Sequence, residues 1–388
     1  MQGELFKHAT LILRDALVGA DGRSPLMVIG CGRGKLPMAA PARNLYTSER
    51  FRTSFGLALD LPTSHAVLSA KHGVVGPDQI LEPYDLDLLT LPDADQRSWA
   101  DQAVNQLAIL AEGRTITVLA CDAYARPLLK ANQARPKPVE IITPWLELGA
   151  PERLVWLREA RRMATRIRDL DRLYSWIEAE RAAGRVFPFA NLSVSAVPKR
   201  GVYIFLDPSE RNFRRTAPRV VRIGTHAVSA GSQASLRDRL RTHLGPFNEI
   251  GNHRGSIFRL HVGRAMLESK LGHSCLRTWG LGQNAGPETK VLERAHEIAV
   301  SRYLKRLHVV LLDIDDEPSK DSRRARAEMQ LIALFSDTLR PIDFPASEWL
   351  GLNSPVESIR QSGLWNIRGI GERYDPAGAG SIASLLEA

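Results

Sequence analysis

The sequence predicts a mixed α/β protein with two domains: an N-terminal α/β domain with a mainly parallel sheet, and a C-terminal α+β domain with a small central sheet. Three observations lead to this prediction. The chain has 388 residues, more than a single domain usually contains. Its first half alternates short apolar runs with helical patterns, as parallel sheets do. Its second half has two short strands in succession, followed by a helix with one apolar face.

The N-terminal half begins with helical apolar spacing over residues 5–17 and a buried strand over residues 26–30. This strand leads into a basic, glycine-rich loop that contains Cys31, Arg33 and Lys35. A loop of this kind at a strand end suits an anion. It is not a Walker loop, because the spacing and the final Ser or Thr are missing.

Polar residues also gather after the next strand, residues 66–69. They are Lys71, His72, Tyr84 and Asp85. Because the carboxyl ends of parallel strands meet at one edge of a sheet, we expect these side chains to share a cleft with the basic loop. Asp122 and Tyr124, which follow a third strand at residues 117–121, are further candidates for the same cleft.

Four short motifs in this half form a series: the Cys-plus-Lys loop at residues 31–35, Leu45-Tyr46 followed by Phe51, Leu68-Ser69 followed by Gly73, and Pro83-Tyr84-Asp85. The series resembles YaaA-type peroxide-stress proteins and related uncharacterised domains. The resemblance implies nucleic acid or a base as the ligand, and it does not imply catalysis. The residues it nominates for contact are Cys31, Arg33, Lys35, Tyr46, Lys71, His72, Tyr84 and Asp85.

Two interpretations of this cluster remain open. In a glycosylase, Asp85 would stabilise an oxocarbenium-like sugar while Lys71 or His72 protonates the leaving base. In a binding module, Asp85 caps a turn, and Lys71 and His72 bind a phosphate. We favour the binding module, with ligand contact over a purely structural role.

A long helical pattern over residues 154–183 carries several arginines. It would either lie along a phosphate backbone or form a solvated link between the two domains. We place the first domain at residues 1–165, the basic helix and linker at 166–198, the second domain at 199–375, and a flexible tail at 376–388.

The second domain opens with a strand over residues 201–206 and another over residues 220–225. Ser235 is a plausible N-cap for a helix that follows and that carries Arg239 and His243 four residues apart on one face. The strands contain Gly201-Val202-Tyr203 and Arg222-Ile223-Gly224.

This order of strand, strand and helix resembles the core of GIY-YIG nucleases, which are named after two such tripeptides. Arg222 stands where the family usually has its second tyrosine. The resemblance implies an arginine on the following helix, here Arg239, and a glutamate on a later helix that holds one divalent metal ion. We nominate Glu297 for that ligand, with Glu293 as the alternative, and Asn366 for the family's late asparagine near the metal. The implied cofactor is Mg²⁺ or Mn²⁺.

The chemistry of these residue types agrees with phosphodiester hydrolysis, which needs a base for water, a cation for the developing charge and a proton for the leaving oxygen. Near a metal, Tyr203 would deprotonate water. Arg239 would clamp two non-bridging oxygens. A single carboxylate suits Mg²⁺, which keeps most of its waters. His243 would donate a proton or bind phosphate. The candidate catalytic residues are therefore Tyr203, Arg222, Arg239, His243, Glu297 and Asn366.

Later segments add smaller expectations. His253 and Arg254, just before a predicted strand over residues 256–262, are candidates for phosphate contact. A buried strand over residues 309–314 and a helix over 321–339 follow. Trp349 and Trp365 are expected to pack over an edge of the core.

The composition limits the class of protein. The formal net charge is +9, from 52 Lys and Arg against 43 Asp and Glu, which suits a polyanionic partner. Three cysteines, Cys31, Cys121 and Cys275, are too few and too scattered for a disulfide framework or a zinc site. No apolar run reaches transmembrane length, and the first residues lack the pattern of a signal peptide, so we expect a cytoplasmic protein without a membrane partner.

Together these features predict a metal-dependent endonuclease with an N-terminal module that recognises bases or DNA, in restriction-type defence or repair. DNA is favoured over RNA, and a homodimer remains open. One alternative is a base-excising glycosylase coupled to strand cleavage. The other is a non-catalytic nucleic-acid-binding protein on a decayed nuclease fold, which Arg222 in place of a tyrosine would explain.

Overall fold

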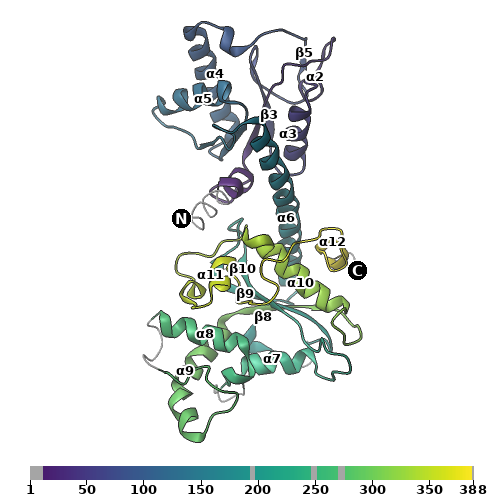
Figure 1. Cartoon of the computed structure of the whole chain (residues 1–388), viewed down its shortest axis with the longest axis vertical. Coiled ribbons are helices and arrows are strands. Elements are labelled where there is room, and N and C mark those ends of the chain that lie inside the picture. The colour runs from purple at the N-terminus through teal and green to yellow at the C-terminus, as the bar shows by residue number, and fades with distance from the viewer. Residues whose placement is uncertain (1–11, 193–196, 246–250, 270–275, 387–388) are drawn as a thin grey trace. The chain divides into compact units, whose positions relative to one another are not determined.

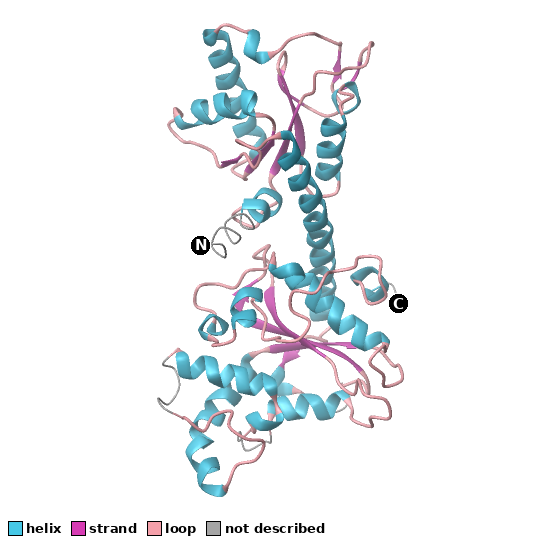
Figure 2. Cartoon of the chain, viewed as in Figure 1, coloured by secondary structure: helices cyan, strands magenta, loops and turns pink. Residues whose placement is uncertain are grey.

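The computed structural model describes residues 12–192, 197–245, 251–269 and 276–386. Its contacts divide the chain into two compact units, Met1–Arg168 and Asp169–Ala388 (Figure 1). The division falls within the long helix α6 (Ala150–Ala182), which confirms the helical pattern predicted over residues 154–183. Each unit is built around its own sheet (Figure 2).

The sheet of the N-terminal unit is mainly parallel, as predicted. Strand β1 is parallel to β3 and β6, β6 is parallel to β7, and β4 runs antiparallel to β3 at the edge. The order is β4 (Gly73–Val75), β3 (His65–Ser69), β1 (Leu26–Gly30), β6 (Ile116–Leu119) and β7 (Ile141–Ile142). A separate two-stranded sheet pairs β2 (Ala40–Pro41) with β5 (Ile80–Leu81).

The strands of this sheet are buried because helices cover it. Helices α4 (Asp93–Ala111) and α5 (Asp122–Gln133) bury Leu107 and Leu128 against Val28 and Val118. Helix α3 (Glu49–Leu59) contacts β1 and is capped by Ser48, whose hydroxyl accepts from the backbone N–H of Phe51. Residues 12–18 are helical, and the rest of the helix predicted over residues 5–17 lies outside the described residues. The short elements are α2 (Ala42–Leu45) and η1 (Leu88–Thr90).

The sheet of the C-terminal unit is small and antiparallel. Its order is β10 (Pro218–Gly224), β9 (Gly201–Arg211), β11 (His308–Asp313) and β8 (Phe187–Pro188). Three of these strands correspond to the strands predicted near residues 201, 220 and 309. The mixed α/β class with a parallel and an antiparallel sheet is therefore confirmed.

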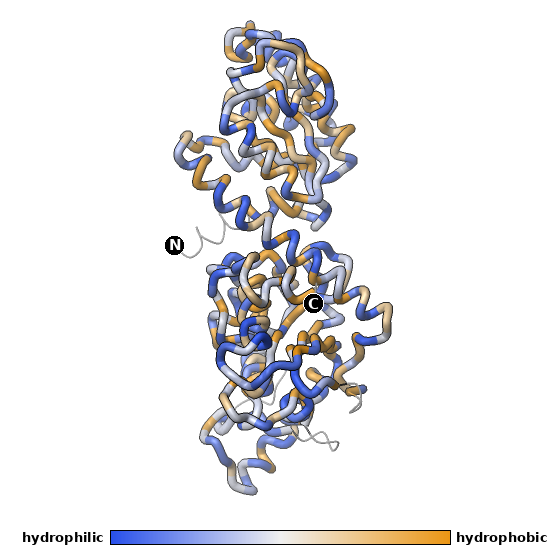
Figure 3. Tube along the Cα trace, turned by 90° about the vertical axis from the view of Figure 1, so that its right-hand side faces the viewer, coloured by the Kyte–Doolittle hydropathy of each residue, from blue (hydrophilic) through white to orange (hydrophobic). Residues whose placement is uncertain are grey.

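Helices lie on both sides of this sheet (Figure 1). Helices α7 (Leu236–Leu244), α8 (Ile257–Glu268) and α9 (Pro287–Arg306) pack on one face, and α10 (Arg323–Ser336) packs on the other. The first face holds an aromatic core that includes Tyr203, Phe205 and Phe258. Hydrophobic and hydrophilic residues alternate over short stretches of the trace in both units (Figure 3). The remaining elements are η2 (Phe189–Asn191), η4 (His253–Gly255), η5 (Asp337–Leu339), η6 (Leu350–Asn353), α11 (Glu357–Ser362) and α12 (Ile382–Leu386).

Local sequence signals set the ends of α7. Ser235 caps it, as predicted, in a reciprocal capping box with Asp238. Gly245 ends it at a φ of 83°, a conformation that favours glycine.

Three expectations for the second half are revised. Residues 256–262, predicted as a strand, form the N-cap and first turns of helix α8: Ser256 caps it, and the polar Arg259 and His261 are buried while the apolar Ile257 is exposed, against the predicted alternation. Trp349 and Trp365 lie within the core instead of over its edge, with ring centroids 5.1 Å apart. The predicted tail contains α12, in which Ile382 is buried.

Among the described residues, no helix is both long and apolar enough to cross a membrane. Helix α6 is the longest, and it carries charged residues throughout.

Candidate active site

A cleft of about 710 Å³ opens in the C-terminal unit beside β10, between α7 and α10. Segments far apart in the sequence meet there. Its walls include Arg222 from β10, Asp238, Arg239 and Thr242 from α7, Glu328, Met329 and Ile332 from α10, and Asn366 and Arg368 from the segment after α11. The cleft thus collects three of the predicted catalytic residues, Arg222, Arg239 and Asn366.

Arg222 is a buried cation with a defined position. Its Nη1 donates to the backbone oxygen of Trp365 at 2.8 Å, and its guanidinium lies 4.7 Å from the ring centroid of Phe258. Its Nε makes no hydrogen bond in the described part of the chain. A guanidinium held in this way keeps donors for a ligand in the cleft.

Arg239 supplies a second cation on the α7 side. It is partly buried, and the described residues offer its Nε no hydrogen-bond acceptor. Its charge and that of Arg222 both act on the same carboxyl group across the cleft, that of Glu328.

Glu328 is a carboxylate of this cleft that the sequence analysis did not nominate. Its Oε1 accepts from the backbone N–H of Thr225 at 3.2 Å, which places the carboxylate at the end of β10. Burial raises the pKa of Glu328 above its usual range, although Arg222, the Thr225 N–H, Arg239 and Arg368 act in the opposite direction. The sequence feature that could have indicated Glu328 is its position on the helix predicted over residues 321–339, which follows the strand predicted over residues 309–314.

Tyr203 and His243 lie behind the cleft and are not part of its walls. Both are fully buried, and the Tyr203 hydroxyl is 3.0 Å from His243 Nε2. His243 Nδ1 is 2.7 Å from the Ser256 hydroxyl. Burial, with the charges of Arg222, Arg239 and Arg259, lowers the pKa of His243 well below its usual value, so this imidazole is neutral.

Gly224 explains why Tyr203 fits against β10. A Cβ at Gly224 would lie 2.1 Å from the Tyr203 hydroxyl oxygen, so the ring occupies the space that any side chain would need. The two tripeptides are thus complementary in shape: the tyrosine of the first packs on the glycine of the second.

Asn366 borders the cleft, but its side-chain amide forms hydrogen bonds with the backbone of β10. The side-chain oxygen accepts from the Ile223 N–H at 3.1 Å, and the side-chain nitrogen donates to the Ile223 oxygen at 2.8 Å. The N–H of Trp365 donates to the Val221 oxygen at 2.7 Å. This segment therefore hydrogen-bonds to the outer edge of β10 and accepts a hydrogen bond from Arg222 at the cleft.

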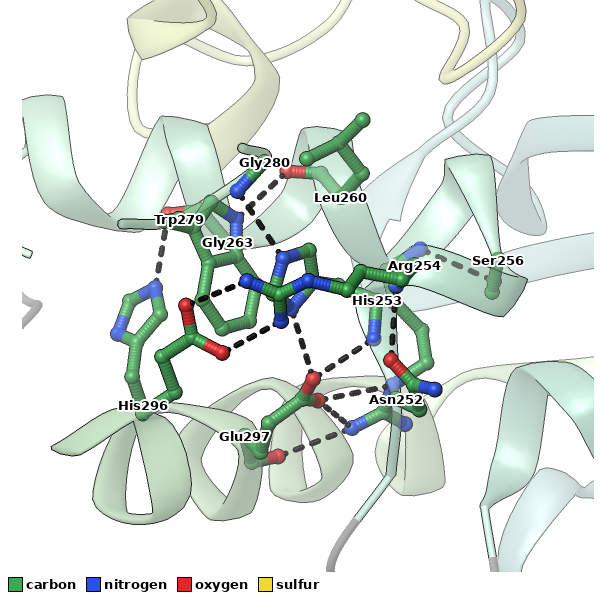
Figure 4. A network of polar contacts seen from close by, with 12 residues as sticks. Asn252, His253, Arg254, Ser256, Leu260, Gly263, Trp279, Gly280, His296 and Glu297 are labelled. Carbon is green, nitrogen blue, oxygen red and sulfur yellow. Dashed lines mark hydrogen bonds and ion pairs between the residues drawn. The ribbon is translucent and has the colours of Figure 1, made fainter. Parts of the chain in front are cut away.

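The structure does not bring Glu297 to this cleft. Its carboxylate is buried in a separate network (Figure 4), where Oε1 accepts from His253 N and Nδ1 at 2.7 and 2.9 Å, and Oε2 accepts from Arg259 Nη2 and Nε at 2.7 and 3.1 Å. Burial alone would raise the pKa of Glu297, but the bonds from His253 and Arg259 lower it below its usual range. Both carboxylate oxygens of Glu297 accept hydrogen bonds from within the protein, so this side chain stabilises the fold.

The alternative ligand and the two expected phosphate contacts belong to the same region. Glu293 forms a two-point ion pair with Arg254, at 2.5 and 2.9 Å. The His253 ring stacks on Trp279 at 3.8 Å, and its Nε2 accepts from the Gly280 N–H (Figure 4). His253 and Arg254 therefore bind the glutamates of α9, and these contacts hold η4 against that helix.

In the N-terminal unit, most of the predicted cluster does converge at the carboxyl ends of β1 and β3. The Tyr84 hydroxyl lies 3.0 Å from that of Tyr46 and 2.8 Å from that of Ser69. The ammonium groups of Lys35 and Lys71 lie 4.2 and 5.8 Å from the Tyr84 ring centroid.

Further members surround this tyrosine. The ring of His72 meets it edge-on at 5.3 Å, and Cys31 Sγ is 3.2 Å from the hydroxyl of Tyr124. Burial raises the pKa of Tyr84, as does the nearby Cys31, so the phenol stays protonated. Arg33 and Asp85 are exposed; Arg33 pairs with Asp87 at 3.1 Å instead.

The carboxylate of Glu328 could hold a metal ion in the cleft. Within the described ranges, no group of three or more His, Cys, Asp or Glu residues has the arrangement of a metal site. Glu328 has one oxygen bonded to the Thr225 N–H, which leaves the other for a ligand. A single carboxylate together with water and substrate oxygens is a normal environment for Mg²⁺.

Comparison with known protein families bears on both units. A family model described as a GIY-YIG domain matches residues 164–388, more than half of the chain. The chain belongs to the GIY-YIG family. This membership supports a nuclease-type hydrolase that acts on nucleic acid, in a family that generally depends on a divalent metal. The resemblance of the C-terminal half is thereby confirmed.

Residues 26–159 match a family of unknown function, DUF6884. The resemblance to YaaA-type proteins is not supported by these matches. No curated protein and no solved structure matches the chain.

Proposed function

We propose that the protein is a divalent-metal-dependent nuclease whose reaction centre is the cleft between α7 and α10. The observation that carries this proposal is the convergence of Glu328 with the guanidinium groups of Arg222 and Arg239 in a GIY-YIG domain. Glu328 takes the place that Glu297 had in the sequence-based hypothesis.

The positions of the cleft residues indicate a different role for each of them. Glu328 would hold Mg²⁺ or Mn²⁺, which supplies charge stabilisation to the phosphate when bound. Arg239 clamps the non-bridging oxygens, and Arg222 adds a second positive charge from the strand side. Asn366 positions β10. Because Tyr203 and His243 are sealed behind Arg222 and Arg239, we assign them a positioning role in place of proton transfer.

The test compares cleavage by the parent protein and by Glu328→Gln. Labelled DNA and RNA are incubated with each protein in Mg²⁺ or Mn²⁺, and products are resolved on a gel. We expect the variant to lose at least about a hundredfold in rate, because the metal loses its protein ligand. Equal cleavage by both proteins would remove Glu328 from the centre, and no cleavage by the parent under any divalent ion would favour the non-catalytic alternative.

We further propose that the N-terminal unit recognises a base or a nucleic-acid feature through the cluster around Tyr84. Two ammonium groups close to one tyrosine ring favour an anionic ligand with an aromatic part. A recognition module joined to a nuclease agrees with restriction-type defence or repair of DNA in the cytoplasm, by a monomer or a homodimer. Base excision has less support, since Asp85 is exposed.

This second proposal is tested with Lys35→Ala/Lys71→Ala. We expect it to remove any preference between plain and base-modified DNA while cleavage of plain DNA continues. A parent protein that cuts both substrates equally well would refute the recognition role.

A further inference from the structure

A second hollow, of about 530 Å³, lies along α7 in the same unit. Its polar walls include three cations: Arg237 and Arg241 from α7, and Lys305 from α9. Its apolar walls include Leu192, Val197 and Leu244. We call this hollow the α7 groove.

The α7 groove adjoins the catalytic cleft. Thr242 and Gly255 line both hollows. On a helix with 3.6 residues per turn, Arg237 and Arg241 share one face, while Arg239 between them points to the opposite face. Helix α7 is thus the wall between the two hollows, with one cation in the cleft and two in the groove.

The charges of the two hollows differ. The cleft combines arginines with the carboxylates of Asp238, Glu328 and Glu372. Among the described residues that line the α7 groove there is no carboxylate, and the acid that interacts electrostatically with Arg237 and Arg241 is Asp238, which lines the cleft. The Nε of Arg237 is buried, and no described residue accepts a hydrogen bond from it. Cations beside an apolar wall match a strand with phosphates on one side and bases on the other.

We propose that the α7 groove binds the unpaired nucleotides on one side of the scissile phosphate. This proposal rests on the proposed function, which places that phosphate in the cleft. Arg237 and Arg241 contact successive phosphates of the strand, and the surface of Leu192, Val197 and Leu244 receives a base. An α-helix is about 10–12 Å across, so a strand leaving the cleft needs only a few nucleotides to pass α7.

The experiment measures binding of a fluorescein-labelled single-stranded DNA of about 20 nucleotides by anisotropy, in EDTA and over a series of salt concentrations. The variant is Arg237→Ala/Arg241→Ala in the full-length chain. The control is Arg211→Ala/Arg294→Ala, which removes the same charge from two exposed arginines that line neither hollow. A blunt duplex of the same sequence is the second probe.

We expect the groove variant to bind the single strand about tenfold or more weakly, with the slope of log affinity against log salt smaller by about 1.4, for two lost phosphate contacts. The control should change affinity less than about threefold, and the groove variant should lose less on the duplex than on the single strand. An unchanged salt slope, or equal losses for variant and control, would overturn the groove proposal. An equal loss of affinity for the single strand and for the duplex would overturn the proposal that the groove binds unpaired nucleotides. None of these results depends on cleavage, so failure of the nuclease proposal shows separately, in the Glu328→Gln assay.

Discussion

At the scale of single residues, two glutamates on successive long helices have opposite environments. Glu297 of α9 accepts four hydrogen bonds from His253 and Arg259 in a closed network. Glu328 of α10 lines the cleft and accepts one from the Thr225 N–H. A carboxylate whose bonds are all internal stabilises the fold, whereas one with a spare oxygen in a cationic cleft can bind a metal.

Glu297→Gln should therefore act on stability. The change leaves the buried guanidinium of Arg259 without its counter-charge, and loss of one partner of a buried ion pair costs about 3–5 kcal/mol. Urea unfolding would measure it. Glu268→Gln, an exposed glutamate at the end of α8, serves as the control, with an expected change within about 0.5 kcal/mol. A stable Glu297→Gln protein without activity would instead return Glu297 to the reaction centre.

Glu328→Gln should behave in the opposite way. Because burial raises the pKa of Glu328, its ionised form is unfavourable in the folded protein at neutral pH, and a neutral amide relieves this cost while keeping the bond from Thr225. We expect a Tm equal to or above that of the parent without metal. Mg²⁺ or Mn²⁺ should raise the Tm of the parent and not of the variant. An equal rise in both proteins would place the ion elsewhere.

At the scale of elements, the site depends on how β9, β10 and α7 fit together. Tyr203 of β9 packs on Gly224 of β10 and reaches His243 of α7. The segment of Trp365 and Asn366 then pairs with β10 from outside. These contacts set the position of Arg222 and Arg239, although neither Tyr203 nor His243 lines the cleft.

Gly224→Ala tests this fit. The new methyl group would overlap the Tyr203 hydroxyl, and overpacking of this kind costs about 1–3 kcal/mol. We expect a lower Tm and weaker cleavage together. Gly286→Ala, where a Cβ meets nothing within 4 Å, is the matched control, with a cost below about 1 kcal/mol at this N-cap. A normal Tm for Gly224→Ala would show that Tyr203 can move without consequence.

At the scale of the whole molecule, buried histidines of the C-terminal unit link its stability to pH. Burial lowers the pKa of His226 and of His261 to about 4, and that of His243 also falls well below its usual value. The unfolded chain binds these protons near pH 6.5, whereas the folded unit does not. The contribution of these histidines to the free energy of unfolding is therefore fully present above about pH 6.5, and it is lost as the pH falls toward 4.

Thermal unfolding between pH 7.5 and 4 would measure this dependence. We expect a falling Tm in that window, and a shallower fall in His226→Gln/His261→Gln, which removes two of the titrating groups. An identical slope in the variant would assign the pH dependence to other groups.

Much of this protein could be derived from its sequence. Periodicity and turn residues identified the strands around residues 28, 67, 203 and 222, the helix with Arg239 and His243, and the mixed α/β class. The order of these elements also indicated the GIY-YIG family. Such signals are local, because the period of apolar residues and the capping or turn residues are set by consecutive positions of the chain.

Only the tertiary structure decided which side chains share a cleft. Nothing local distinguishes Glu328 from Glu297, because the difference lies in partners 38 to 103 residues away: His253 and Arg259 for Glu297, and Thr225 for Glu328. The same holds for the alternating pattern at residues 256–262, which is helical: its polar Arg259 is buried, where Glu297 accepts its hydrogen bonds from another helix. Local sequence determines most of the elements, whereas long-range packing determines the electrostatic environment in which each charged group acts.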